Sequence, residues 1–113
     1  MSENLFRIKI DLEDRLLTVY KNNKWFKEYP VAIGKKQTPT PKGNFTIINK
    51  QVSPGGAFGA RWLGLNAKGI GIHGTNDASS IGRAVSHGCI RLHNHHVIDL
   101  FQYIEVNTTV EIV

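Results

Sequence analysis

The first part of the chain alternates apolar and polar positions with a period of two. In residues 6–12, charged residues separate four apolar ones, namely Phe6, Ile8, Ile10 and Leu12. This alternation is typical of a strand with one buried face. Leu17 and Val19 continue it after a turn at Glu13–Asp14, and Asn22–Asn23 indicates a hairpin turn, because asparagine tolerates the positive φ angles of tight turns. We therefore expect a β meander in the first third of the chain.

The middle of the chain predicts loops between short strands. Residues 35–42 contain two prolines, which cannot join a central strand, and an extended pattern resumes over residues 43–48. Residues 53–59 are rich in glycine and are expected to form the rim of a cleft. Two short strands over residues 62–66 and 69–73 then follow, and they place His73 at a strand end.

The C-terminal part predicts one helix and a closing strand. Asn94 is a favourable helix cap, and a helical apolar stripe follows it, formed by Val97, Ile98, Leu100, Phe101 and Ile104. Residues 110–113 are expected to form the closing strand. Large aromatic residues are expected in the core rather than in a ligand site, namely Trp25, Phe26, Trp62 and Phe101. The sequence thus predicts a mainly β domain with one short C-terminal helix.

Length and composition favour one globular domain over residues 1–113. The chain is 41% hydrophobic and contains one cysteine, which cannot form an internal disulfide. Met1–Asn4 provides neither a basic start nor an apolar run, so we expect no signal peptide in this chain, and no stretch is long enough to insert into a membrane. Lysine and arginine outnumber aspartate and glutamate by 14 to 9, but they are scattered, so no nucleic-acid partner is expected.

The candidate chemistry is concentrated in residues 73–92. This segment holds the only cysteine of the chain, Cys89, together with His73, His87 and Arg91. A thiolate is a strong nucleophile, and a neighbouring imidazole or cation is expected to lower the pKa of the thiol. If the segment is extended, His87 and Cys89 point to the same side with Cα atoms roughly 7 Å apart. The segment therefore predicts a site for covalent acyl transfer.

Residues near this thiol are expected to help bind the substrate and stabilise the oxyanion. Gly88 removes a side chain where a substrate carbonyl must approach, and the backbone amides of Gly88 and Cys89 are expected to stabilise an oxyanion. Arg91 lies on the same face if the chain stays extended, and its guanidinium suits the carboxylate of a substrate. Gly71 and Gly74 are expected to let the backbone approach the substrate closely.

These motifs resemble those of the L,D-transpeptidase catalytic domain, the YkuD-like family. The resemblance rests on Ser86–Arg91 (SHGCIR) preceded by Gly71–Thr75 (GIHGT), with further blocks upstream at Thr38–Phe45 and Gly59–Leu65 in the family order. It implies a β-sandwich-like fold and a cysteine nucleophile that remodels bacterial peptidoglycan through a thioester. The implied partners are peptidoglycan stem peptides and, as covalent inhibitors, carbapenem-type β-lactams.

The resemblance also implies roles for individual residues. Cys89 is the expected nucleophile and His73 the expected base, with the Gly74 carbonyl or a neighbour holding its other ring nitrogen, while His87 shapes the site or assists a proton. The expected substrate-binding residues are Arg91, Gly71, Gly74, Ser86 and Gly88. No metal or cofactor is expected, and the protein is expected to be a monomer. The family implies a location in the cell envelope or spore envelope.

Three alternative functions remain open at this point. The single thiol and all five histidines form a set that suits zinc, although the spacing of paired ligands in known zinc motifs is absent. The second alternative is a module that binds the cell wall through the same cleft without catalysing a reaction. The third alternative is an L,D-carboxypeptidase or another cysteine hydrolase, which passes the acyl group to water instead of an amine.

Overall fold

The computed structural model describes residues 5–113, so the expectation drawn from Met1–Asn4 lies outside the described residues. The first strands are β1 (Phe6–Asp11), β2 (Leu16–Lys21) and β3 (Lys24–Pro30), which pair antiparallel in succession. Asn22 and Asn23 both have positive φ angles, 53° and 67°, at the turn between β2 and β3. The predicted β meander is therefore confirmed.

The remaining strands of the main sheet come from distant parts of the chain. They are β5 (Gly43–Val52), β6 (Arg61–Leu65), β7 (Gly71–His73), β9 (Ile90–Arg91) and β10 (Thr109–Ile112). The eight-stranded sheet has the order β3-β2-β1-β10-β5-β6-β7-β9. The predicted closing strand, β10, lies in the middle of this sheet, parallel to β1 and antiparallel to β5.

A small second sheet and three helical segments complete the fold. β4 (Ile33–Gly34) and β8 (Ala84–Ser86) form a parallel pair. The helical segments are the 3₁₀ turns η1 (Gly56–Phe58) and η2 (Ala78–Ser80) and the helix α1 (Asn94–Phe101), which packs against β6 and β7. Among residues 5–113, no helix has the length and apolar character needed to cross a bilayer.

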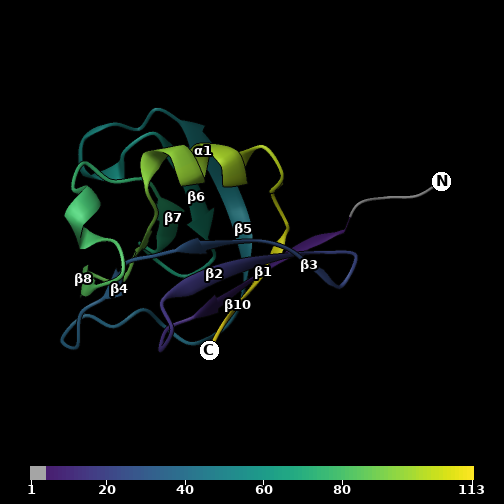
Figure 1. The fold of residues 1–113 in the computed structure, drawn as a ribbon, viewed down its shortest axis with the longest axis horizontal. Helices are drawn as coiled ribbons and strands as arrows, with labels where there is room; N and C mark the ends of the chain where they lie inside the picture. The colour runs from purple at the N-terminus through teal and green to yellow at the C-terminus, as the bar shows by residue number, and fades with distance from the viewer. Residues whose placement is uncertain (1–4) are drawn as a thin grey trace.

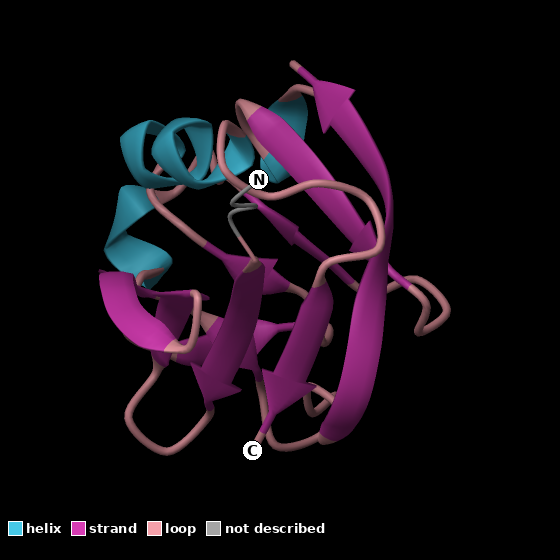
Figure 2. Cartoon of the chain, turned by 90° about the vertical axis from the view of Figure 1, so that its right-hand side faces the viewer, coloured by secondary structure: helices cyan, strands magenta, loops and turns pink. Residues whose placement is uncertain are grey.

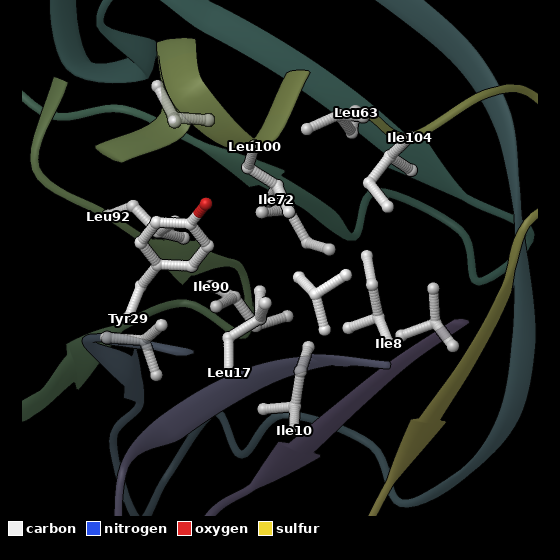
Figure 3. Packing of buried hydrophobic residues seen from close by; sticks show 14 of the residues in the cluster. Ile8, Ile10, Leu17, Tyr29, Leu63, Ile72, Ile90, Leu92, Leu100 and Ile104 are labelled. Atoms are coloured by element: carbon white, nitrogen blue, oxygen red, sulfur yellow. The ribbon is translucent and has the colours of Figure 1, made fainter. Parts of the chain in front are cut away.

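The long sheet curls so that its two halves face each other. In Figure 1, β1, β2, β3 and β10 lie below β5, β6 and β7, with α1 along the top, and Figure 2 shows the curl from the side. Buried side chains from both halves and from α1 meet between them (Figure 3), among them Ile8, Ile10, Leu17, Leu63, Ile72 and Leu100. The predicted mainly β, sandwich-like fold with one short C-terminal helix is confirmed.

Several details differ from the sequence-based expectations. His93, and not Asn94, is the N-cap residue of α1, because the side chain of Asn94 is engaged elsewhere. The helix ends at Phe101, so Ile104 lies beyond it although it is buried, and Ile98 is 44% exposed. Trp25, on the edge strand β3, is 59% exposed, so its expected place in the core was wrong.

Candidate active site

A cavity of about 290 Å³ collects the residues that carry the candidate chemistry. Its lining residues come from four separate segments and are Ala57, Phe58, Gly69, His73, Ser86, His87, Cys89 and Arg91. The structure thus brings Cys89, His73, His87 and Arg91 together around one space. Two residues of the glycine-rich loop, Ala57 and Phe58, lie at this cavity, which confirms the expectation that residues 53–59 form a cleft rim.

Cys89 lies between β8 and β9 and is partly buried. Its thiol donates a hydrogen bond to the Gly69 carbonyl, with Sγ and O 3.4 Å apart. Burial raises the pKa of this thiol, and this effect outweighs the Gly71 backbone N–H and the Arg91 charge, which both lower it. The expected depression of the pKa was therefore wrong. The resting group is a neutral thiol that needs a base to become nucleophilic.

His73 ends β7 and is buried between two aromatic rings. Its ring stacks on Trp62 at a centroid distance of 5.7 Å and an interplanar angle of 14°. Phe58 meets it edge to face at 5.1 Å. Nδ1 is hydrogen-bonded to the Gly74 carbonyl, the contact expected from the family resemblance. Because a carbonyl oxygen only accepts, Nδ1 carries the hydrogen, and Nε2 of the neutral ring is left as a proton acceptor.

The charge state of His73 agrees with the role of a base. Burial lowers the pKa of His73, the Arg91 charge lowers it further, and the hydrogen bond to Gly74 opposes both effects. The imidazole is therefore neutral at neutral pH. The cavity therefore holds a neutral thiol and a neutral imidazole rather than a preformed ion pair. The assignment of His73 as the base rather than His87 stays a prediction.

His87 and Arg91 reach the cavity by a different backbone path from the one expected. Residues 87–88 form a bend, and Gly88 has a φ of 121°, so the segment is not extended there. Both side chains nevertheless line the cavity beside Cys89. Among residues 5–113, neither of the two ion pairs involves Arg91. Its guanidinium lowers the pKa of Cys89, of His73 and of Asp77, which places its positive charge close to the site.

Ser86 organises the backbone around Cys89. Its hydroxyl donates to the Cys89 carbonyl at 2.6 Å and accepts from the Gly88 amide at 3.1 Å. The Gly88 amide is thus already engaged, and its expected place in an oxyanion site was wrong. The Cys89 amide makes no hydrogen bond within the part of the chain that the structure describes. One of the two expected amides therefore remains for an oxyanion.

Gly71 and Gly74 were expected to make room for substrate, and the structure contradicts this. A Cβ atom on Gly71 would lie 2.5 Å from carbon atoms of the Trp62 indole. A Cβ atom on Gly74 would collide with Oδ1 of Asn94 and would lie 2.9 Å from the Ala60 amide. Neither glycine lines the cavity. Both make room for the packing of the protein around His73.

The zinc hypothesis grouped residues that lie in two separate places. His93, His95 and His96 are at the start of α1, with ring centroids 4.1–5.5 Å apart, and do not line the cavity. In residues 5–113 there is no group of three or more histidine, cysteine, aspartate or glutamate side chains arranged to hold a metal ion.

Sequence reasoning missed the contribution of Asn94 to the site. Its Oδ1 accepts from the Ala60 and Thr75 amides at 3.0 and 3.2 Å, and its Nδ2 donates to the Thr75 carbonyl at 3.0 Å. These contacts join α1 to the loop before β6 and to the segment that follows His73. The sequence indicated only a cap, because such contacts between distant segments leave no local pattern. Trp62, expected in the core, was likewise missed as the partner that stacks on His73.

A thiol and a neutral imidazole that face one cavity of a curled β fold define a candidate site for cysteine-dependent catalysis. The family model of the L,D-transpeptidase catalytic domain (YkuD) matches residues 6–112, and the chain belongs to this family. YkuD of Bacillus licheniformis is 50% identical to it over 107 residues, which is 95% of this chain and 65% of the relative. The chain thus spans slightly less than two thirds of that relative.

Solved structures agree with this assignment. An L,D-transpeptidase from Enterococcus faecium is 28% identical, with a TM-score of 0.84, and the match covers 98% of this chain and 50% of that one. L,D-transpeptidase 3 from Mycobacterium tuberculosis, in complex with a faropenem-derived adduct, is 18% identical with a TM-score of 0.85, covering 96% of this chain and 60% of that one. The second likeness concerns the fold alone.

Proposed function

We propose that this domain transfers acyl groups between peptidoglycan stem peptides, as an L,D-transpeptidase with Cys89 as the nucleophile. One observation carries the proposal. The Cys89 thiol shares a cavity with a neutral His73 ring whose Nδ1 is held by the Gly74 carbonyl. This arrangement leaves Nε2 to accept a proton, the task a base performs for a cysteine nucleophile. Membership of the family supports the class of substrate.

The first half of the reaction forms a thioester. Nε2 of His73 takes the thiol proton while Sγ of Cys89 attacks the carbonyl carbon between the third and fourth residues of a stem peptide. The carbonyl oxygen becomes an oxyanion, to which the Cys89 amide donates a hydrogen bond. The oxyanion then collapses and the C–N bond breaks. The terminal D-amino acid leaves as an amine after it receives the proton from His73.

The second half resolves the thioester. The amine of a second stem peptide attacks the thioester carbonyl and gives a proton to His73. The C–S bond breaks, and the sulfur recovers a proton from the imidazole. Water in place of the amine would give an L,D-carboxypeptidase. Analysis of the products with and without an amine acceptor separates the two reactions.

Arg91 and His87 provide the polar contacts of the cavity. Arg91 is proposed to bind a carboxylate of the stem peptide, because a guanidinium offers two parallel donors to such a group. His87 is proposed to shape the cavity beside the thiol.

Further proposals concern inhibitors and location. One solved L,D-transpeptidase is in complex with the carbapenem imipenem, and the M. tuberculosis relative carries an adduct derived from the penem faropenem. We therefore propose that carbapenem-type β-lactams acylate Cys89 in the same way as a stem peptide. We also propose a place in the cell envelope or spore envelope, where the proposed substrate lies, and a monomeric state.

The test uses a defined stem tetrapeptide and intact-mass analysis. We expect a Cys89-linked acyl adduct without an acceptor and a cross-linked product with one, and neither with the Cys89→Ala variant. A wild-type protein that yields neither adduct nor product would refute the proposal. Product formation by Cys89→Ala would remove the thiol from the mechanism.

A further inference from the structure

Thr40 bridges the nucleophile segment and the loop that leads away from β4. Its side chain lies in the interior, with 4% of the residue exposed. The hydroxyl accepts from the Gly34 amide at 2.9 Å and donates to the Gly88 carbonyl at 2.8 Å. In the described part of the chain no other hydrogen bond reaches this carbonyl. One hydroxyl therefore holds the peptide group that precedes Cys89.

This peptide group also sets the direction of the Cys89 amide. A trans peptide is planar, and its C=O and N–H bonds point in opposite directions. The described residues contain no cis peptide bond. Because the Gly88 carbonyl points to Thr40, the Cys89 N–H points away from Thr40. The Gly88 amide is bound to Ser86, so it cannot compete for an oxyanion.

We propose that Thr40 is a positioning residue for acyl transfer. By holding the Gly88 carbonyl, its hydroxyl fixes the plane of the Gly88–Cys89 peptide and thereby aims the Cys89 amide at the oxyanion. The inference rests on the proposed function. It assigns to the loop of residues 35–42 a role in the reaction although Thr40 does not line the cavity.

The same loop offers a matched control in Thr38. The Thr38 hydroxyl donates to the Ser86 carbonyl at 2.8 Å, so it also joins the loop to the nucleophile segment. The Ser86 carbonyl, however, accepts a second hydrogen bond from the Lys35 amide at 3.0 Å. Loss of the Thr38 hydroxyl leaves that carbonyl paired, whereas loss of the Thr40 hydroxyl leaves the Gly88 carbonyl without a donor.

The experiment compares two reactions of the same thiol. Acylation by imipenem or by a stem tetrapeptide passes through an oxyanion, whereas alkylation by iodoacetamide does not. We expect Thr40→Val to slow acylation about tenfold to a hundredfold, less than the loss of a whole oxyanion donor. Alkylation should change less than about twofold, because the thiol and its base keep their places. Thr40→Ser keeps the hydroxyl and should restore acylation, and Thr38→Val should acylate at nearly the wild-type rate.

Several outcomes would overturn the inference. Unchanged acylation in Thr40→Val would show that the hydroxyl has no role, and an equal fall of acylation and alkylation would show a general loss of structure around the thiol. If Thr40→Val does not fold, Thr40→Ala, which avoids any steric excess, is measured instead and judged by the same ratio. The wild-type arm separates the two proposals. Without Cys89-dependent acylation of the wild type, the proposed function itself fails.

Discussion

Asn94 should be important for stability although its residue type suggests only a helix cap. The change to alanine removes three hydrogen bonds between distant segments, namely those to the Ala60 amide, the Thr75 amide and the Thr75 carbonyl. It also opens space beside Gly74, whose carbonyl holds His73. We therefore expect both the stability and the catalytic geometry to suffer.

The size of the effect follows from the number and exposure of these contacts. A hydrogen bond of this kind contributes about 1 kcal/mol, and the three together give about 3 kcal/mol. Asn94 is an exposed residue, so water can replace part of this loss, and we expect a fall of about 2 kcal/mol in the free energy of unfolding. For a domain of this size the fall corresponds to a decrease of roughly 6–10 °C in Tm.

The assay is denaturant unfolding at neutral pH, combined with the rate of acylation by a stem peptide. Asn94→Asp is the matched control, because its carboxylate can still accept from both amides, while the donation to the Thr75 carbonyl is replaced by an oxygen that this carbonyl repels. An acidic residue in the first turn of α1 is also favourable to the helix. We expect Asn94→Asp to lose less than half of the stability that Asn94→Ala loses.

If Asn94→Ala unfolds within about 0.5 kcal/mol of the wild type, the contacts have no net effect and water replaces them fully. If Asn94→Asp is as unstable as Asn94→Ala, acceptance by Oδ1 is not what holds the two segments.

Further predictions concern the cavity. His73→Ala should abolish acylation, because the proton acceptor is lost, while His87→Ala should weaken it less; the reverse ranking in a stopped-flow acylation assay would reassign the base. Arg91→Ala should raise KM for the stem peptide more than it lowers the alkylation rate of Cys89, and unchanged kinetics would exclude a contact with the substrate carboxylate. Because burial raises the pKa of Cys89, its alkylation by iodoacetamide should reach half of its maximum above pH 8.5, the ordinary thiol value, and a midpoint near neutrality would contradict the neutral pair. Because the pKa of His73 is lowered in the folded protein, its imidazole should stay neutral as the pH falls through about 6.5, whereas the same imidazole in the unfolded chain binds a proton. The free energy of unfolding should therefore decline below that pH. Urea titrations should show this decline for the wild type and a smaller one for His73→Ala.

Local patterns were sufficient to predict the meander. Ile8 and Ile10 alternate with charged residues, and this period of two requires only that one face of a strand is buried. A period of two could not predict β8 and β9, because these strands contain only three and two residues and are too short to show it. The central place of β10 depends on pairing with two distant strands, which the sequence of residues 109–112 does not encode locally.

The site was predictable as a set of reactive residues but not as an arrangement. The chemistry of Cys89, His73 and Arg91 is specific enough to mark them, and the structure places all three at one cavity. The sequence did not predict that the pKa of Cys89 is raised, because the burial that raises it depends on the whole fold. Gly71 and Gly74 were misinterpreted for a related reason, since a glycine makes room equally for a substrate or for the Trp62 and Asn94 side chains.

The position of β10 bears on how the molecule acquires its shape. Thr109–Ile112 pairs with β1 on one side and β5 on the other, so until this last strand is available the N-terminal meander and the rest of the sheet each expose an unpaired edge. Pairing between residues about 100 positions apart is slow, because a long loop must close first. The two parts of the sheet can therefore join through β10 only after the ribosome has released nearly the entire domain.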